Sequence, residues 1–406
     1  DIPIEIGLLQ NLKFLYLGAN KLSGHIPSNI FNISELQEID LSWNNLSGSI
    51  HSNMCHGLPN LQMLHLQDNE LSGALPSNWI QCKELKDLQL EYNSLIGDIP
   101  EGIGELDMLQ ELYLNHNNLQ GHIPKDIGNL TELQLLYLSD NNLKGDIPED
   151  IGKLDMLQGL CLDHNNLQGI PSNICHGLPN LQMLNLQDNE LSGALPSNWI
   201  QCKELKDLRL EQNSFTGDIP NEIGNLKSLR ILYLDVNQFF GQIPLTIFNI
   251  SELQNIDLSW NNLWGGIPSN ICDGLSKLQI LFLGNNKLFG AIPSSWIQCK
   301  QLKELQLEEN AFTGDLPGGI GSLTMLQVLN LRYNNLKEHG ATGVVSTKVD
   351  VYSYGIILIE VFTRKKPTED MFASRLNLKS WILQGRTKIC NKRRKKNAEE
   401  NLVQGR

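Results

Sequence analysis

The stretch Leu229-Arg-Ile-Leu232-Tyr-Leu234-Asp-Val-Asn237-Gln-Phe239-Phe-Gly241-Gln-Ile243-Pro244 decides the fold. The step from Leu232 to Leu234 is the period of a β-strand, which puts both side chains on one side of the pleat. Asn237 follows where the chain has to turn, and Gly-x-Ile-Pro cannot continue a helix or a central strand. A unit of this size cannot bury its own leucines, so we expect copies of it on either side.

The unit recurs through most of the chain, and its asparagine marks each copy. Asparagine stands at positions 20, 44, 69, 93, 117, 141, 165, 189, 213, 237, 261, 286, 310 and 334. The step is 24 residues in eleven of the thirteen intervals and 25 in the other two. This period and the leucine offsets resemble those of leucine-rich repeats. We therefore predict a solenoid of about 14 repeats over residues 1–336, in which each repeat contacts mainly its neighbours.

Each half of the repeat has an expected place in this solenoid. The strands should stack into a parallel sheet that lines a concave face, with the residues beside the inner leucines pointing outward. The other half, such as 124–130, should form short 3₁₀ or helical turns on the outer side. The repeated asparagine carries both a donor and an acceptor, so we expect it to satisfy backbone groups of the adjacent turn as an internal ladder.

Charge divides the chain near residue 337. Residues 338–406 carry a balance of +7, whereas residues 1–337 carry −20, within a total of −13. The acidic part argues against nucleic acid as a partner. The sequence holds no run of 18 apolar residues, so we expect no membrane span in it. Because it starts at Asp1-Ile-Pro, inside a repeat unit, we interpret its beginning as truncated.

The pattern LxxLxLxxNxLxGxIPxxIGxL resembles the plant-specific class of leucine-rich repeat, which forms the ectodomains of plant receptor-like kinases. The resemblance covers residues 1–336. It implies an α/β leucine-rich repeat solenoid, a right-handed superhelical array with a concave parallel β-sheet. It also implies that the Gly-x-Ile-Pro part adds a second strand and a superhelical twist.

A second resemblance covers residues 338–386, which are similar to a small piece of the C-terminal lobe of such a kinase. It rests on the segment from Glu338 to Glu360, which contains Asp350-Val-Tyr-Ser-Tyr-Gly355. We assign 337–385 to a remnant of this lobe, with a helix expected from Asp350 to about Phe362, and 386–406 to a basic disordered tail. The glycine-rich loop, strand lysine, H-R-D and D-F-G that phosphoryl transfer requires do not occur after residue 337. We therefore expect no kinase activity, no cofactor and no metal.

Six cysteines form three pairs with a separation of 27 residues, on the outer side of adjacent repeats: Cys55/Cys82, Cys175/Cys202 and Cys272/Cys299. Adjacent repeats are about 5 Å apart, so a bridge within each pair is geometrically possible and would imply an oxidising compartment. The alternative is that duplication copied two buried free cysteines, because residues 55–99 recur almost verbatim at 175–219. Cys161 has no evident partner.

Glycosylation sequons stand at Asn32, Asn45, Asn129 and Asn249. Chance alone gives roughly four sequons in a chain with this many asparagines, so their number carries no information. Only the resemblance to receptor ectodomains implies glycans at these positions.

Function is expected on the concave face, where aromatic side chains alternate with carboxylates. Such a surface suits an extended peptide or a protein, although the same residues could merely keep an exposed sheet soluble. The candidate ligand-binding residues are Tyr113, Tyr137, Asp163, Arg209, Glu211, Tyr233, Asp235, Asp257 and Trp260.

These observations predict a binding module and not an enzyme. The resemblance implies the ligand-recognition part of a truncated plant receptor-like kinase in defence or developmental signalling, located outside the cell or on the outer face of the plasma membrane. A co-receptor kinase is a possible second partner. Two alternatives stay open: an incomplete gene model of an active membrane receptor serine/threonine kinase, and a secreted inhibitor of cell-wall-degrading enzymes. The full transcript would distinguish them.

Overall fold

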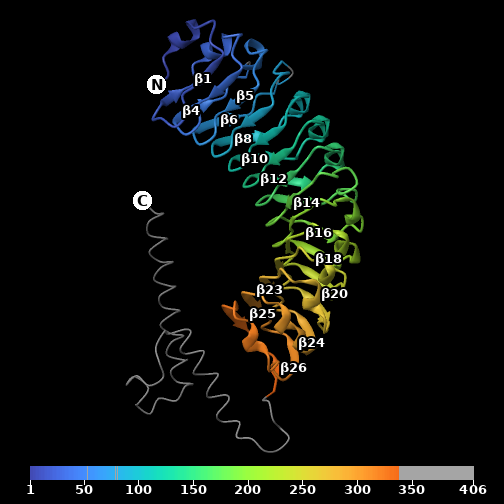
Figure 1. The fold of residues 1–406 in the computed structure, drawn as a ribbon. Helices are drawn as coiled ribbons and strands as arrows, with labels where there is room; N and C mark the ends of the chain where they lie inside the picture. Colours follow the sequence, from blue (N-terminus) through green and yellow to red (C-terminus); the bar gives the residue numbers. More distant parts are fainter. Residues whose placement is uncertain (53, 78, 80, 338–406) are drawn as a thin grey trace, which may run out of the picture. The chain divides into compact units, whose positions relative to one another are not determined.

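The computed structural model describes residues 1–52, 54–77, 79 and 81–337, which form one curved stack of repeats (Figure 1). Contacts within the chain divide it into residues 1–337 and 338–406. The kinase-like segment, the helix expected from Asp350 to Phe362 and the basic tail therefore lie outside the described residues. In the described part, no helix is long and apolar enough to cross a membrane.

The first half of every repeat forms one strand of a parallel sheet on the concave face, and the strands follow each other in sequence order. Each strand has three residues, and its central residue, such as Leu232, points into the core. The second leucine of the Leu-x-Leu pair lies just beyond the strand. The strands are β1 (Phe14–Tyr16), β3 (Glu38–Asp40), β5 (Met63–His65), β7 (Asp87–Gln89), β9 (Glu111–Tyr113), β11 (Leu135–Tyr137), β13 (Gly159–Cys161), β15 (Met183–Asn185), β17 (Asp207–Arg209), β19 (Ile231–Tyr233), β21 (Asn255–Asp257), β23 (Ile280–Phe282), β25 (Glu304–Gln306) and β27 (Val328–Asn330).

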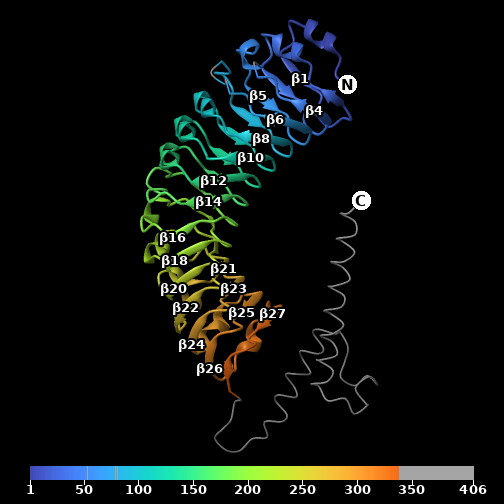
Figure 2. The ribbon, with the colours of Figure 1, turned by 180° about the vertical axis from the view of Figure 1, so that it is seen from behind.

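The Gly-x-Ile-Pro half contributes second strands, as the resemblance implied, and these form two parallel sheets of seven strands each. The first holds β2 (Ser23–His25), β4 (Asn45–Ser49), β6 (Glu70–Ala74), β8 (Ser94–Asp98), β10 (Asn118–Gly121), β12 (Asn142–Asp146) and β14 (Asn166–Gly169). The second holds β16 (Ser192–Ala194), β18 (Ser214–Asp218), β20 (Gln238–Gln242), β22 (Asn262–Gly265), β24 (Lys287–Ala291), β26 (Ala311–Gly314) and β28 (Asn335–Leu336). The array twists as it curves, so the sheets face different directions at its two ends (Figures 1 and 2).

The division between β14 and β16 has a cause in the sequence that the repeat period does not reveal. The repeat there reads Gly169-Ile170-Pro171 and lacks the residue that stands between glycine and isoleucine elsewhere. The glycine of this motif has a positive φ in other repeats, for example 76° at Gly121, but Gly169 does not. The pairing of β12 with β14 shifts register between Gly145 and Asp146. The missing residue therefore ends the first of the two sheets.

The outer side consists of short 3₁₀ turns, as predicted, and the helical part of the fold is small. One α-helix, α1 (Ile271–Gly274), occurs among the described residues. The 3₁₀ helices are η1 (Ile4–Leu8), η2 (Ser28–Asn32), η3 (Met54–Gly57), η4 (Glu101–Glu105), η5 (Lys125–Asn129), η6 (Glu149–Lys153), η7 (Trp199–Gln201), η8 (Asn221–Asn225), η9 (Ile247–Asn249), η10 (Ser294–Gln298) and η11 (Ile320–Ser322).

The repeated asparagines form the expected ladder between neighbouring repeats. The side-chain amide of Asn237, which is 8% exposed, donates to the carbonyl oxygens of Leu210 at 3.0 Å, Leu234 at 3.3 Å and Asp235 at 3.1 Å. Its oxygen accepts the backbone N–H of Phe215 at 2.9 Å. From Asn44 onward, each ladder asparagine thus satisfies backbone groups of two repeats that would otherwise be without partners.

Candidate functional site

The repeat places two kinds of side chain on the concave face. Within each strand the residues on either side of the buried leucine point outward, as Ile231 and Tyr233 do in β19. The residue before each ladder asparagine has a left-handed backbone, with φ between 51° and 56°. Non-glycine residues rarely adopt this conformation, and at Val236 and Trp260 it is a marked departure from their preferences.

This left-handed position carries exposed aromatic side chains at the end of the concave strands. Trp260 is 61% exposed, and the equivalent Trp43 is exposed to the same extent. The repeat pattern predicts Trp260 as a candidate ligand-binding residue but does not predict the backbone that presents it. The ladder asparagine fixes the turn, so the preceding side chain projects away from the core.

Tyr113 and Tyr137 lie on the neighbouring strands β9 and β11 and contact each other edge to face, with ring centres 4.9 Å apart. Burial raises the pKa of both phenols. The next strand, β13, has Gly159 beside them. A Cβ atom at Gly159 would lie 3.2 Å from the Tyr137 ring, so the glycine leaves space for this ring. The two tyrosines form one aromatic group at the middle of the concave sheet.

Asp163, the third candidate, is 9% exposed and lies among neighbouring polar groups. It accepts a hydrogen bond from the Ser139 hydroxyl at 2.5 Å, and His164 Nδ1 lies 3.0 Å from its second oxygen. Asp140, Asp163 and His164 have ligand atoms within 4.8 Å of one another, a spacing that could hold a metal ion. The contacts inside the group account for its geometry without an ion.

Arg209 and Tyr233 lie on the neighbouring strands β17 and β19. The guanidinium carbon of Arg209 is 5.4 Å from the centre of the Tyr233 ring. Its Nε and Nη2 also donate to the Asp207 carboxylate at 3.0 Å and 3.1 Å. The Tyr233 hydroxyl accepts a hydrogen bond from Asn255 at 3.2 Å. These contacts hold both side chains in place on the concave face.

Three carboxylates surround this pair. Burial raises the pKa of Glu211 to about 7, although the nearby Arg209 charge opposes the shift. Burial and the charges of Asp257 and Glu211 raise the pKa of Asp235 to about 7. Burial also raises the pKa of Asp257, against the hydrogen bonds that it accepts from Ser259.

The structure therefore collects eight of the nine candidates into two groups along one face, and Asp163 lies between the groups, just after β13. Arg209, Glu211, Tyr233, Asp235, Asp257 and Trp260 come from three successive repeats, whereas Tyr113 and Tyr137 lie further towards the N-terminus. Between the groups stand β13 and β15, where the free Cys161 is 8% exposed and burial raises its pKa to about 12. From β9 to β21 there are six strand spacings, or about 29 Å at roughly 4.8 Å each.

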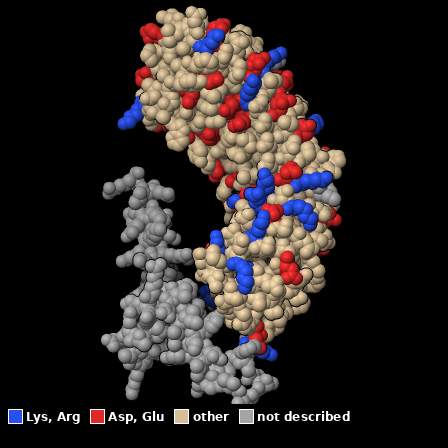
Figure 3. Space-filling view, viewed as in Figure 1, with Lys and Arg blue, Asp and Glu red and all other residues tan. Residues whose placement is uncertain are grey.

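Charge is unevenly distributed over the array. Figure 3 shows many acidic side chains over the N-terminal part and a group of lysines and arginines near the middle. The sequence from Lys203 to Arg230 holds five lysines and arginines. The candidate group at β17–β21 thus combines buried carboxylates with a basic stretch in the same repeats.

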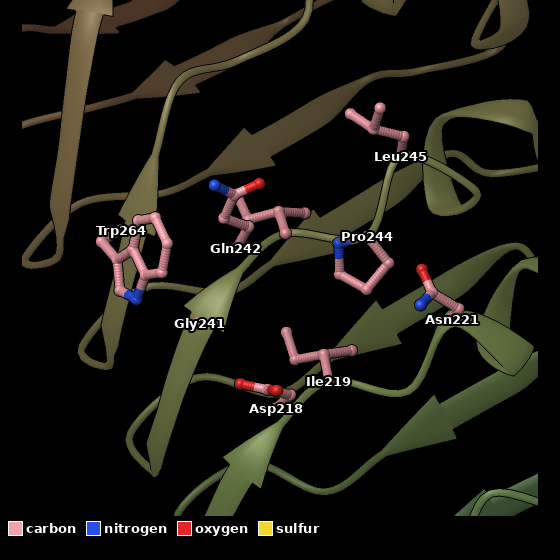
Figure 4. A pocket seen from close by; sticks show the side chains of 9 residues that line it. Asp218, Ile219, Asn221, Gly241, Gln242, Pro244, Leu245 and Trp264 are labelled. Carbon is pink, nitrogen blue, oxygen red and sulfur yellow. The ribbon is translucent and has the colours of Figure 1, made fainter.

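Sequence reasoning missed a surface pocket of about 440 Å³ beside the second sheet. Trp264 lies on one side of this pocket, with Leu245 and Asn221 on the opposite side (Figure 4). Trp264 is 45% exposed, and the residues at the same position of the adjoining repeats, Phe240 and Phe289, are 50% and 51% exposed. The signal was three successive aromatic residues before the motif glycine, at a position that most other repeats fill with polar residues.

The six paired cysteines form three disulfides in the structure, each between adjacent repeats: Cys55–Cys82, Cys175–Cys202 and Cys272–Cys299. Their Cα atoms lie 5.0 to 5.2 Å apart, within the ordinary range for a disulfide. The sequon asparagines Asn32, Asn45, Asn129 and Asn249 are all exposed, and three of them end a 3₁₀ helix.

The concave parallel sheet, the asparagine ladder and the outer 3₁₀ turns define a leucine-rich repeat array. The family model described as "Leucine-rich repeat region" matches residues 114–242. The model "Leucine rich repeat" matches 9–71, 83–143 and 276–336, and a third repeat model matches 252–273.

Solved structures agree with this assignment. The ectodomain of the Arabidopsis receptor kinase HAESA, solved with an N-terminally extended IDA peptide hormone, is 37% identical, with a TM-score of 0.79 over 83% of this chain and 56% of that chain. A further HAESA structure contains IDA and the co-receptor SERK1. A leucine-rich repeat protein of Leptospira interrogans is 33% identical, with a TM-score of 0.63 over 83% of this chain and 88% of that chain.

Among curated proteins, the Arabidopsis LRR receptor-like serine/threonine-protein kinase EFR is 49% identical over 53 residues, which are 12% of this chain and 5% of EFR. The chain thus spans about half the length of the HAESA ectodomain and a small part of EFR. It belongs to the leucine-rich repeat proteins, and its array is that of a plant leucine-rich repeat receptor-like kinase ectodomain.

Proposed function

We propose that the chain binds an extended peptide along the concave face, as the ligand-recognition module of a plant receptor in defence or developmental signalling. The observation that carries the proposal is the pair of ordered side-chain groups, Tyr113/Tyr137 and Arg209/Tyr233, on parallel strands of one open sheet. At about 3.3 Å per extended residue, a peptide of about nine residues spans the distance between β9 and β21.

The character of the surface supports this proposal. Half-buried aromatic rings provide contact area at little entropic cost, and charged groups beside them fix the register of a ligand. The side chains are already held by contacts with each other, which lowers the cost of ordering them on binding. The solved HAESA complexes, which contain a peptide hormone, favour a peptide ligand for the same architecture. Three disulfides suit the extracellular location that we propose.

A specific observation favours a second protein partner, such as a co-receptor, on the second sheet. Phe240, Trp264 and Phe289 are exposed at the same repeat position of β20, β22 and β24 and form what we call the aromatic row, and Trp264 also lines the pocket of Figure 4. We propose that this row contacts the partner, and Trp264→Ala should abolish its capture while peptide affinity is kept. Purified SERK1 ectodomain with a selected peptide is the probe, and equal capture by the variant would contradict the proposal.

The peptide proposal is tested with random 12-residue peptides displayed on phage and selected against the full chain. We expect enriched peptides whose affinity, measured by calorimetry, falls at least 10-fold in the variant Tyr113→Ala/Tyr137→Ala. The matched control Thr131→Ala/Glu132→Ala changes exposed residues between the same two strands and should bind as the unchanged chain does. Failure to enrich any peptide, or equal losses in both variants, would contradict the proposal.

A further inference from the structure

Glu211, Asp235 and Asp257 come from three successive repeats and face the same side of the concave sheet. Glu211 and Asp235 occupy equivalent positions, and the amide of Gln212 donates to the carbonyl of Asp235 at 3.0 Å. The amide of Leu234 donates to the carbonyl of Asp257 at 2.9 Å. The three carboxylates thus come from adjoining repeats of one face, and we call them the acidic site.

Glu211 is the least satisfied member of the acidic site. The residue is only 6% exposed, and its oxygen Oε2 is buried without a hydrogen-bond partner among the described residues. Leaving an ionised carboxylate buried and unpaired is costly, so such a group either takes up a proton or acquires a cationic partner.

The cationic group that acts on Glu211 is Arg209, and it already has other partners. Arg209 donates its Nε and Nη2 to Asp207, and its guanidinium lies over the Tyr233 ring. Asp257 is satisfied in another way, because Ser259 donates both its backbone N–H at 2.9 Å and its hydroxyl at 2.6 Å to Asp257 Oδ1. The carboxylate oxygen without a partner therefore lies on Glu211, and Asp235 occupies the equivalent position of the next repeat.

A second glutamate at the same repeat position provides a useful comparison. Glu91 also has a buried, unpaired Oε2, and burial with the charges of Asp68 and Asp87 raises its pKa to about 7. There too the cationic group is engaged with another carboxylate, since His65 Nε2 lies 2.6 Å from Asp87. His65 lies on the neighbouring strand, and its charge acts on Glu91.

We propose that the acidic site binds the cationic side chain of an arginine or lysine of the ligand. Tyr233 pairs with Asp257 on the neighbouring strand, and the exposed Trp260 follows Asp257 by three residues. Aromatic rings suit the stem or the plane of such a side chain. This inference rests on the proposed peptide-binding function and adds to it a rule for the ligand: one basic residue must reach Glu211 and Asp235.

Charged groups around the site predict how binding depends on pH. Glu211 is influenced by Arg209, Asp207 and Asp257, and Asp235 by Asp257 and Glu211, while Glu308 acts on Asp257. Burial holds the pKa of Glu211 and Asp235 at about 7, so both are partly protonated near neutrality. A bound cation favours their ionised forms, and affinity should therefore rise as pH increases from 5 to 8.

The test uses the peptides selected on the full chain, each compared with versions in which one lysine or arginine is replaced by glutamine. One replacement should lower affinity at least 10-fold on the unchanged chain and less than 2-fold on the variant Glu211→Gln/Asp235→Asn. The control Glu204→Gln, an exposed glutamate of the same repeat, should retain the full effect. Acetylation of the peptide N-terminus distinguishes a terminal ammonium from a side chain, and we expect no loss from acetylation.

The outcomes separate this inference from the proposed function. Peptides could bind through the concave tyrosines and yet lose the same affinity, on replacement of a lysine or arginine, to the unchanged chain and to the variant Glu211→Gln/Asp235→Asn. The acidic site is then not the cation site. A 10-fold loss on acetylation alone would also overturn the inference, because the ligand group would then be the terminal amine. If the Tyr113→Ala/Tyr137→Ala variant binds normally, the proposed function itself fails.

Discussion

The guanidinium group of Arg209 lies over the ring of Tyr233, 5.4 Å from its centre, on the neighbouring strand of the concave sheet. Asp207 holds the arginine and Asn255 donates to the tyrosine hydroxyl, so the pair is fixed from both sides. Because these side chains are ordered before a ligand arrives, binding does not have to order them. The pair thus combines a charged and an aromatic contact on neighbouring strands of the concave face.

Replacing Tyr233 and Asp235 together by alanine should weaken binding of a selected peptide by about 2 kcal/mol, or roughly 30-fold. The reason is the loss of an aromatic contact and a carboxylate in adjoining positions. Calorimetry with the full chain measures the change. The control variant Asn225→Ala/Lys227→Ala alters exposed residues of the same repeat, on the outer side of the solenoid. Unchanged affinity in the Tyr233/Asp235 variant would move the binding site elsewhere.

Glu211 should make the array less stable as pH rises from about 4.5 to 7. Its pKa of about 7 lies above that of an exposed glutamate, so in this window the folded state holds more protons than the unfolded state. Stability is therefore greatest at the acidic end of the window and falls towards neutrality. Glu211→Gln removes the cost of ionising this buried carboxyl and should stabilise the protein at pH 8 by roughly 1 to 3 kcal/mol.

Thermal unfolding followed by circular dichroism at pH 4.5 and pH 8 measures this effect. The exposed Glu204→Gln should leave the difference between the two pH values unchanged. A Glu211→Gln chain with the same midpoint as the unchanged protein at pH 8 would show that the carboxylate is not destabilising there.

The asparagine ladder predicts a large loss of stability at a single position. Asn237→Ala removes four hydrogen bonds and leaves the carbonyl of Leu210 and the N–H of Phe215 without this partner. We expect a loss of about 2 to 4 kcal/mol in urea unfolding. Gln238→Ala, at the next and exposed position, should change stability by less than about 0.5 kcal/mol. Similar effects from both substitutions would argue against the ladder as a main support.

The disulfides predict a dependence on reductant. Replacing Cys272 and Cys299 by serine should destabilise the array by about 3 kcal/mol, because the bridge joins two adjacent repeats across 27 residues. Mass spectrometry of unreduced peptides should identify the linked pair in the unchanged chain. A melting temperature that does not respond to the double substitution would contradict this expectation.

Much of the fold followed from the sequence because the repeat is explicit. The spacing of Leu229, Leu232 and Leu234 before Asn237 predicted the strand, the buried face and the ladder, and the structure shows all three. The break in the second sheets did not follow. It arises from one missing residue at Gly169-Ile170. The step from Asn165 to Asn189 is still 24 residues, because the extra residue in Cys175-His-Gly-Leu compensates for the missing one.

The sequence predicted which residues point out of the concave face, but it did not predict the contacts between their side chains. Alternation placed Tyr233 and Asp235 outward, yet the contact of Arg209 with both Asp207 and Tyr233 depends on side-chain rotamers. The buried, unpaired state of Glu211 depends on its neighbours in two other repeats, which a single repeat pattern does not describe. The exposed His164 contacts Asp163 and lies 3.7 Å from Asp188, and the repeat pattern does not describe these contacts either.

Site-specific photo-cross-linking tests the central claim most directly. Benzoylphenylalanine is placed one position at a time on the concave face, at Tyr137, Tyr233 and Trp260, and on the outer side, at Asn129 and Asn225, in the full chain. A selected peptide should cross-link to the three concave positions, through successive peptide residues, and to neither outer position. Cross-links confined to the outer positions would contradict the claim that the ligand lies along the concave sheet.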